Sequence, residues 1–154
     1  MVEVIRNTEL GELDRGFMRL AIAVAQESTE PLKCGSVFVK EGRVLAAEHN
    51  SQRLDSDQSR HAEIKAMGKA GAVLGGKELR DVTVYSTCEP CTMCISAMVF
   101  AEVKRVVYGV SKYDVWPQRI DVGTLEFLGR AETDIEVVAN FMERECAEAL
   151  YPKR

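Results

Sequence analysis

Apolar residues recur at three- and four-residue spacings over residues 10–28, where the repeating positions are Leu10, Leu13, Phe17, Leu20, Ala21 and Val24. This period predicts an amphipathic helix that ends before Pro31. Two strand-like runs follow at residues 36–40 and 43–48, and Glu41-Gly42 lies between them. Such a dipeptide suits a tight turn, so the two runs predict an antiparallel hairpin.

The second half of the chain alternates between helical and strand-like patterns. Residues 50–60 are polar and predict a loop, after which a helix starts near His61 and runs to about Lys69, until the glycines of 71–76 break the pattern. Residues 82–86 and 103–110 read as buried strands, with a helix over 91–100 between them. Residues 111–130 have no regular pattern, residues 135–138 predict a last strand, and 140–150 predict a closing helix capped by Asn140.

This order of elements predicts an α/β fold: a three-layer α/β/α sandwich with a central five-stranded mixed sheet and helices on both faces. The first two strands should be antiparallel. A chain of 154 residues is most simply one domain over 1–154, which is large enough to bury roughly 70% of its unfolded surface.

Composition narrows the class of protein. The chain is 46% hydrophobic and 29% charged, which is ordinary for a soluble protein, and the sequence has no apolar run long enough to cross a membrane. The first eleven residues carry acidic side chains and no apolar stretch, so we expect no secretory signal and a cytoplasmic location. An odd number of cysteines, five, then favours reduced thiols or metal ligands over disulfides.

The charge of the chain bears on its partner. The net charge is −4 and the isoelectric point is near 5.3, with no cluster of Lys and Arg. Proteins that bind phosphate backbones usually carry a basic patch. We therefore expect a small-molecule substrate rather than nucleic acid, although a local basic patch can lie on an acidic protein.

Two short motifs carry the chemistry: His61-Ala62-Glu63 and, thirty residues later, Pro90-Cys91-Thr92-Met93-Cys94. One imidazole and two thiolates make three zinc ligands, and a catalytic zinc site keeps its fourth position open for water. Cys91 and Cys94 lie one turn apart at a helix start, where the partial positive charge favours thiolates. The sequence therefore predicts one Zn²⁺ per chain, bound by His61, Cys91 and Cys94.

Glu63 gives this metal site a catalytic interpretation. Zinc lowers the pKa of a bound water toward ~7, and a carboxylate two residues from the histidine is placed to take the proton of that water. The order H-x-E and then P-C-x-x-C resembles the signature of zinc deaminases. This resemblance implies a hydrolytic reaction in which the proton passes to a ring nitrogen and then to the departing amine, an amidine-like C–NH₂ becomes C=O, and ammonia leaves. Glu63 is the predicted catalytic residue.

Two other interpretations compete. Cys88-x-x-Cys91-x-x-Cys94 matches part of an iron–sulfur ligand run, but that leaves Glu63 without a role and needs a fourth thiol from Cys34 or Cys146. A non-catalytic zinc-bearing scaffold is the other alternative. Zinc binding alone has no use for Glu63, which argues against the scaffold.

Residues 60–64 and 85–94 resemble two motifs of the cytidine deaminase superfamily, in its branch of free-nucleobase (cytosine or guanine) deaminases and tRNA adenosine deaminases. The resemblance is strongest over residues 50–109. It implies a cytidine deaminase-like fold with zinc held between two helices, and a homodimer or higher homo-oligomer. At Lys33-Cys34-Gly35 the chain departs from the family, because it keeps the family's glycine and lacks its proline.

The resemblance also implies substrate contacts. Asn50 stands where the branch has a substrate-binding asparagine, and the backbone around Ala62 and Glu89 is expected to help. Trp116 could stack on a heterocycle and Asp114 could bind its ring N–H or amino group, unless this stretch is a surface loop with one packed aromatic. Together with the charge, these features predict a nucleobase or similar small heterocycle as substrate, with tRNA adenosine (converted to inosine) as the alternative.

Overall fold

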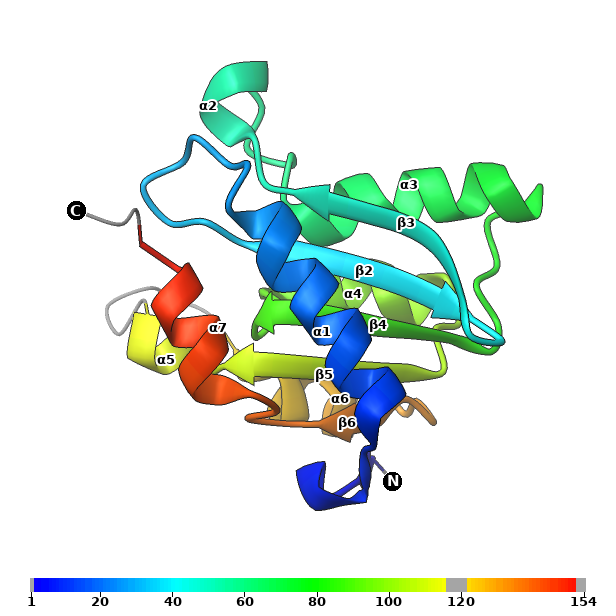
Figure 1. Cartoon of the computed structure of the whole chain (residues 1–154). Helices are drawn as coiled ribbons and strands as arrows, with labels where there is room; N and C mark the ends of the chain where they lie inside the picture. Colours follow the sequence, from blue (N-terminus) through cyan, green and yellow to red (C-terminus); the bar gives the residue numbers. More distant parts are fainter. Residues whose placement is uncertain (1, 116–121, 152–154) are drawn as a thin grey trace.

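The computed structural model describes residues 2–115 and 122–151 and contains one six-stranded mixed sheet with helices on both faces (Figure 1). The strand order is β1-β6-β5-β4-β2-β3; β2 is antiparallel to both of its neighbours, and the other pairs are parallel. The three-layer α/β prediction is confirmed. The strands are β1 (Glu3–Val4), β2 (Gly35–Lys40), β3 (Arg43–His49), β4 (Val82–Cys88), β5 (Arg105–Val110) and β6 (Glu136–Val138).

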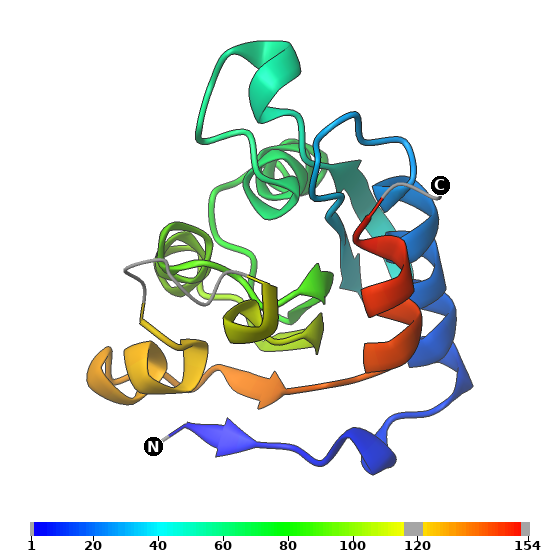
Figure 2. The ribbon, with the colours of Figure 1, turned by 90° about the vertical axis from the view of Figure 1, so that its left-hand side faces the viewer.

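The helices divide between the two faces of the sheet. Figure 2 shows α1 and α7 on one side and α3, α4 and α6 on the other. No helix in the described part of the chain is both long and apolar enough to span a membrane. The helices are the 3-10 helix η1 (Asn7–Glu9), α1 (Glu12–Ala25), α2 (Gln52–Asp55), α3 (Ala62–Leu74), α4 (Thr92–Phe100), α5 (Lys112–Val115), α6 (Thr124–Arg130) and α7 (Glu143–Ala149).

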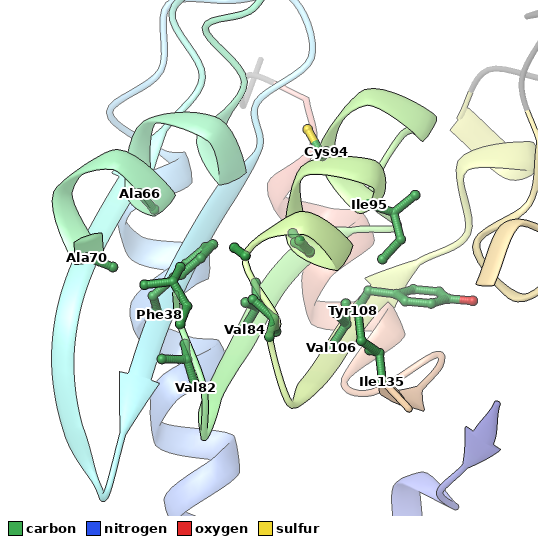
Figure 3. Packing of buried hydrophobic residues seen from close by; sticks show 14 of the residues in the cluster. Phe38, Ala66, Ala70, Val82, Val84, Cys94, Ile95, Val106, Tyr108 and Ile135 are labelled. Carbon is green, nitrogen blue, oxygen red and sulfur yellow. The ribbon is translucent and has the colours of Figure 1, made fainter. Parts of the chain in front are cut away.

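Two hydrophobic clusters lie on opposite faces of the central strands. Phe38, Val84 and Val106 pack with Ile95 of α4 on one face (Figure 3). Their neighbours in sequence, such as Val37 and Val107, pack against α1 and α7 on the other face. Strands that are buried on both faces read as continuous apolar runs, which is why β4 and β5 are visible in the sequence.

The hairpin β2–β3 forms as predicted. Glu41 and Gly42 have φ values of 50° and 73°, the left-handed pair that matches the twist of a tight hairpin. At the other end of β2, a Cβ on Gly35 would overlap the carbonyl of Ala21. Glycine therefore lets α1 approach the start of β2, close to the end of the sheet where the candidate site lies.

Several element boundaries differ from the prediction. The sheet has a sixth strand because the two residues of β1 add to the edge beside β6, a run too short to show a period. The helix expected to end near Lys69 continues to Leu74, because Gly75, with φ 73°, supplies the left-handed C-cap. The predicted loop over 50–60 contains the single turn α2.

The C-terminal half shows larger differences. The irregular stretch 111–130 contains the short helices α5 and α6. Asn140 does not cap the last helix: α7 starts at Glu143 with Met142 as N-cap, and Asn140 Nδ2 donates to the Glu143 side chain. On α1, Leu13 is 77% exposed and Met18 is fully buried, because the packed face is rotated from the one that the leucine spacing suggested.

Candidate active site

The two sequence motifs meet at the carboxyl end of β4. His61 is the N-cap of α3 and Cys91 is the N-cap of α4, and both have extended backbone (φ −70° and −69°). Cys94 lies one turn further along α4 and is fully buried (Figure 3). Both helix starts were predicted, and their N-terminal partial charges face the same point.

The three predicted ligands have the spacing that zinc requires. Cys91 Sγ and Cys94 Sγ are 3.5 Å apart, and each lies 3.6 Å from His61 Nδ1. Tetrahedral zinc with bonds of about 2.0–2.3 Å separates its ligand atoms by roughly 3.3–3.8 Å. The ligand atoms of these three residues all lie within 4.8 Å of one another, so His61, Cys91 and Cys94 are placed to hold zinc.

The two thiols of this site have opposite proton affinities. Contact with the Cys94 thiol, assisted by His61, lowers the pKa of Cys91 to about 4 although partial burial opposes the shift. The same contact, with burial and the nearby Glu63, raises the pKa of Cys94. Cys91 is therefore the thiolate of the metal-free pair, and metal takes the place of the proton that the two sulfurs share.

Glu63 lies beside the zinc ligands and contacts Cys94. Its side chain is 5% exposed, and Cys94 Sγ lies 3.6 Å from its Oε2. Burial, followed by the charge of Cys91, raises the pKa of the Glu63 carboxyl. A buried carboxyl with a raised pKa beside a metal site has the properties of a group that exchanges protons.

A small cavity adjoins the zinc ligands. Its volume is about 20 Å³, which is room for about one water molecule. The lining contains most of the residues expected from the sequence together with three that were not. The lining residues are Cys34, Asn50, Gln52, His61, Ala62, Glu63, Cys88, Glu89 and Cys91.

Asn50 lies in this lining with its side chain bonded to the neighbouring loop. Its Oδ1 accepts a hydrogen bond from Cys34 N at 3.0 Å, and its Nδ2 donates to Leu32 O at 2.8 Å. These bonds hold the segment that leads into β2 against the end of β3. The expected contact between Asn50 and substrate stays a prediction.

Glu89 also lies in the lining, and its carboxylate accepts hydrogen bonds from two separate parts of residues 111–130, the stretch in which the sequence showed no regular pattern. Oε2 accepts from Ser111 Oγ and from Lys112 N, and Oε1 accepts from Thr124 N at 2.9 Å. The backbone N–H of Glu89 donates to Val110 O. Its side chain therefore fixes the chain on both sides of the undescribed residues 116–121.

The other two expected contact residues are not brought to the cavity. Asp114 is exposed on α5, and the described lining does not include it. Trp116 lies outside the described residues. Ala62, by contrast, is fully buried at the first position of α3 and lines the cavity.

Sequence reasoning missed Cys34, Cys88 and Gln52 as lining residues. The antiparallel register Ser36↔Ser86 brings Cys34 opposite Cys88, and their sulfurs lie 2.9 Å apart. That hydrogen bond, followed by burial, raises the pKa of the Cys34 thiol. The motif spacing carried no signal for this pair, because only the pairing of β2 with β4 brings the two residues together.

A larger open groove adjoins the cavity and shares Asn50 and Gln52 with it. Its volume is about 670 Å³. Two carboxylates and one guanidinium lie in its lining, so the groove has no excess of positive charge. The lining residues are Glu30, Pro31, Leu32, Asn50, Gln52, Arg53, Ser56, Asp57 and Gln58.

Known proteins are similar to this chain in sequence and in fold. A guanine deaminase from Bacillus subtilis is 40% identical over 103 residues, which cover 64% of this chain and 65% of that protein, slightly less than two thirds of its length. A tRNA-specific adenosine deaminase from the same organism is 34% identical over 138 residues, 86% of this chain and 83% of the relative.

A solved structure from work on A-to-I editing by tRNA:A34 deaminases superposes with a TM-score of 0.76 at 32% identity, covering 88% of this chain and 99% of that one. The family model of the cytidine and deoxycytidylate deaminase zinc-binding region matches residues 12–110, which contain every zinc-ligand candidate. The chain therefore belongs to the cytidine and deoxycytidylate deaminase family.

Proposed function

We propose that this protein is a zinc-dependent hydrolytic deaminase of a free nucleobase or similar small heterocycle of the cytosine or guanine type. The observation that carries the proposal is the buried Glu63 carboxylate, 3.6 Å from Cys94 Sγ and in the lining of the same cavity as His61 and Cys91. A structural zinc site uses four protein ligands. Here three ligands and one carboxylate converge instead.

In this proposal His61, Cys91 and Cys94 hold the zinc. Zinc in such a site supplies Lewis acidity, which lowers the pKa of water toward ~7. The buried position of Glu63 excludes bulk water from its carboxylate, so a proton that it takes up is passed on to substrate rather than lost to solvent.

Glu63 moves the protons of the reaction. Its carboxylate takes a proton from the attacking water and delivers it to the ring nitrogen next to the reacting carbon. A second proton from the same water goes by the same carboxylate to the amino group, which leaves as ammonia. The balance is C–NH₂ plus H₂O giving C=O plus NH₃, and the enzyme ends in its starting protonation state.

The surroundings of the cavity support a substrate without phosphates. The groove beside it contains the carboxylates of Glu30 and Asp57 and the single guanidinium of Arg53. Hydrogen bonds from Ser59 lower the pKa of Asp57, so it is charged at neutral pH. Two carboxylates next to the cavity repel phosphate and attract N–H donors, which favours a free base, as does the similarity to a guanine deaminase.

A tRNA adenosine deaminase is the second candidate. The observation in its favour is the similarity to a tRNA:A34 deaminase structure over nearly the whole of that chain. Such an enzyme needs a positive surface for the phosphate backbone.

A homo-oligomer and a cytoplasmic location, expected from the sequence, stay predictions.

Replacing Glu63 tests the proposal. We expect Glu63→Ala to keep one zinc per chain and its fold, and to lose kcat by about a hundred-fold or more, the size of general acid–base effects. Ammonia release would be measured on cytosine, guanine, adenine, their nucleosides and a tRNA anticodon stem, with zinc content determined in parallel. Glu126→Ala, which removes an exposed carboxylate from α6, is the matched control. Full activity of Glu63→Ala would contradict the mechanism, and activity on the anticodon stem alone would contradict the free-base assignment.

A further inference from the structure

Gln52, like Cys34 and Cys88, lines the cavity without belonging to either motif. It belongs both to the lining of the small cavity and to that of the open groove. His61, Cys91 and Glu63 line the cavity and not the groove, whereas Arg53 and Asp57 line the groove and not the cavity. Gln52 therefore lies where the cavity and the groove meet.

The amide oxygen of Gln52 has an unusual environment. Oε1 is buried, yet within the described part of the chain it has no hydrogen-bond partner, and it is the one buried side-chain nitrogen or oxygen in that state there. Buried polar atoms are normally paired. An unpaired acceptor on a residue that lines both the cavity and the groove therefore points to a donor brought by a ligand.

The backbone around Gln52 is held by hydrogen bonds, so the point from which its side chain extends is fixed before any ligand arrives. Ser51 N donates to Arg60 O, and Asp57 N donates to Gln52 O. Arg53 N donates to Glu30 Oε1 at 2.7 Å. These bonds join both ends of the 51–60 segment to each other and to the loop that follows α1, so the backbone that carries the acceptor is preorganised.

The contrast with Asn50 strengthens the assignment. Both ends of the Asn50 amide are bonded to the backbone of the 32–34 loop, whereas the Gln52 oxygen has no partner among the described residues.

Resting on the deaminase function proposed above, we propose that Gln52 is a specificity-determining residue. Its amide oxygen accepts a hydrogen bond from a ring N–H on the edge of the heterocycle opposite the reacting carbon. The enzyme thereby selects free bases over bases substituted at that nitrogen.

Pairs of substrates that differ at one N–H test this proposal. The probes are cytosine with 1-methylcytosine and guanine with 9-methylguanine, each assayed with the parent protein and with Gln52→Leu. We expect the parent to prefer the N–H base in kcat/KM by about 10- to 100-fold, and Gln52→Leu to reduce this ratio to near 1 by losing activity only on the N–H base. Gln52→Glu, which keeps an acceptor at the same position, should restore most of the preference.

Controls separate this role from a structural one. Gln58→Leu changes a glutamine that lines the groove and not the cavity, so its ratio should match that of the parent. Zinc content and Tm of every variant show whether it is folded. The Kd values of the same bases for zinc-loaded Glu63→Ala, with and without Gln52→Leu, should show the same ratios without turnover.

The outcomes are distinct. A preference for the N–H base that survives unchanged in Gln52→Leu overturns the inference, because it must then arise from steric exclusion of the methyl group, and the deaminase assignment stands. Absence of ammonia release from every base by zinc-loaded parent protein overturns the proposed function, and the inference that rests on it. Activity of the parent on the tRNA stem alone has the same consequence.

Discussion

The two sides of the catalytic cavity are built in different ways. One side, here called the zinc wall, consists of His61, Glu63 and Cys91 at the N-termini of α3 and α4, together with Cys94, which contacts Cys91 behind the lining. The other, the groove wall, consists of Cys34 and Asn50 at the ends of the β2–β3 hairpin and of Gln52 at the start of α2. Side chains of the zinc wall contact one another at 3.5–3.6 Å, whereas Asn50 of the groove wall is bonded to backbone.

This difference means that the residues for the reaction and the residues for the choice of substrate lie on different walls of the cavity. On the zinc wall the residues needed for chemistry are one turn or less apart within each helix, so the local backbone presents them to one point. On the groove wall the residues come from two segments that only the hairpin brings together. Substitutions on the zinc wall should therefore abolish the reaction, and those on the groove wall should change stability or choice of substrate.

Loss of a zinc ligand should have the largest effect. Cys94→Ala leaves two ligands, so we expect zinc content to fall from one per chain toward zero, activity to fall to background and Tm to drop, because zinc binding contributes to folding. Zinc would be measured by elemental analysis of the dialysed protein. Cys146→Ala, which removes a buried thiol packed against α1 and β5, should keep its zinc. A Cys94→Ala protein that retained stoichiometric zinc would remove Cys94 from the ligand set.

The reactivity of Cys91 should show the next largest effect. Its pKa is lowered to about 4, so in zinc-stripped protein its thiolate persists as the pH falls from 8 to 5. The thiolate of an ordinary thiol, with a pKa near 8.5, declines about ten-fold per pH unit. We expect iodoacetamide at pH 6 to modify Cys91 about 10- to 100-fold faster than the other cysteines, as measured by peptide mass mapping.

Zinc provides the control for this experiment, because metal bound to the thiolate should suppress the reaction. Cys146 provides a second one, because burial raises the pKa of its thiol to about 12. A Cys91 rate that fell ten-fold per pH unit would show that the zinc wall does not hold a thiolate without metal.

Asn50→Ala should have the smallest effect of the three. It leaves the buried Cys34 N–H unpaired and removes the bond to Leu32 O, so we expect the free energy of unfolding to fall by about 1–3 kcal/mol while zinc content stays at one per chain. Urea denaturation measures the change, and Gln58→Ala, on the exposed part of the same loop, is the matched control. Unchanged stability would mean that these bonds do not support the groove wall.

The sequence predicted the zinc wall because its signal is local. His61 and Glu63 are two residues apart, and Cys91 and Cys94 are three apart, so helix geometry alone places each pair. The prediction of the groove wall was partial: Asn50 was expected from the resemblance to the deaminase branch, but Cys34 and Gln52 were not. Cys34 reaches the cavity through strand register, and Gln52 reaches it through α2, a single turn whose period is too short to detect.

The errors in the predicted fold have the same cause: elements with a strong local sequence pattern were found, and elements held by distant residues were missed. The buried strands β4 and β5 and the hairpin were correct, because burial on both faces or a two-residue turn leaves a strong local pattern. Helices α5 and α6 were missed, since each is only one or two turns long, and α6 is anchored by Thr124 N donating to Glu89, a residue 35 positions away. No local window contains that bond.

The sequence by itself predicted the α/β class, the zinc ligands and the neighbouring carboxylate, because each depends on spacings within one helix or one strand; the type of reaction followed from the resemblance of these motifs to a known family. Only the tertiary structure decided what else lines the cavity and the groove: a paired Asn50 amide, a Gln52 oxygen without a partner in the described part of the chain, and two carboxylates. These depend on the pairing of strands and on loops held by distant backbone groups. Physical interactions between segments far apart in the chain have no fixed sequence spacing, so they become visible only when the chain is folded.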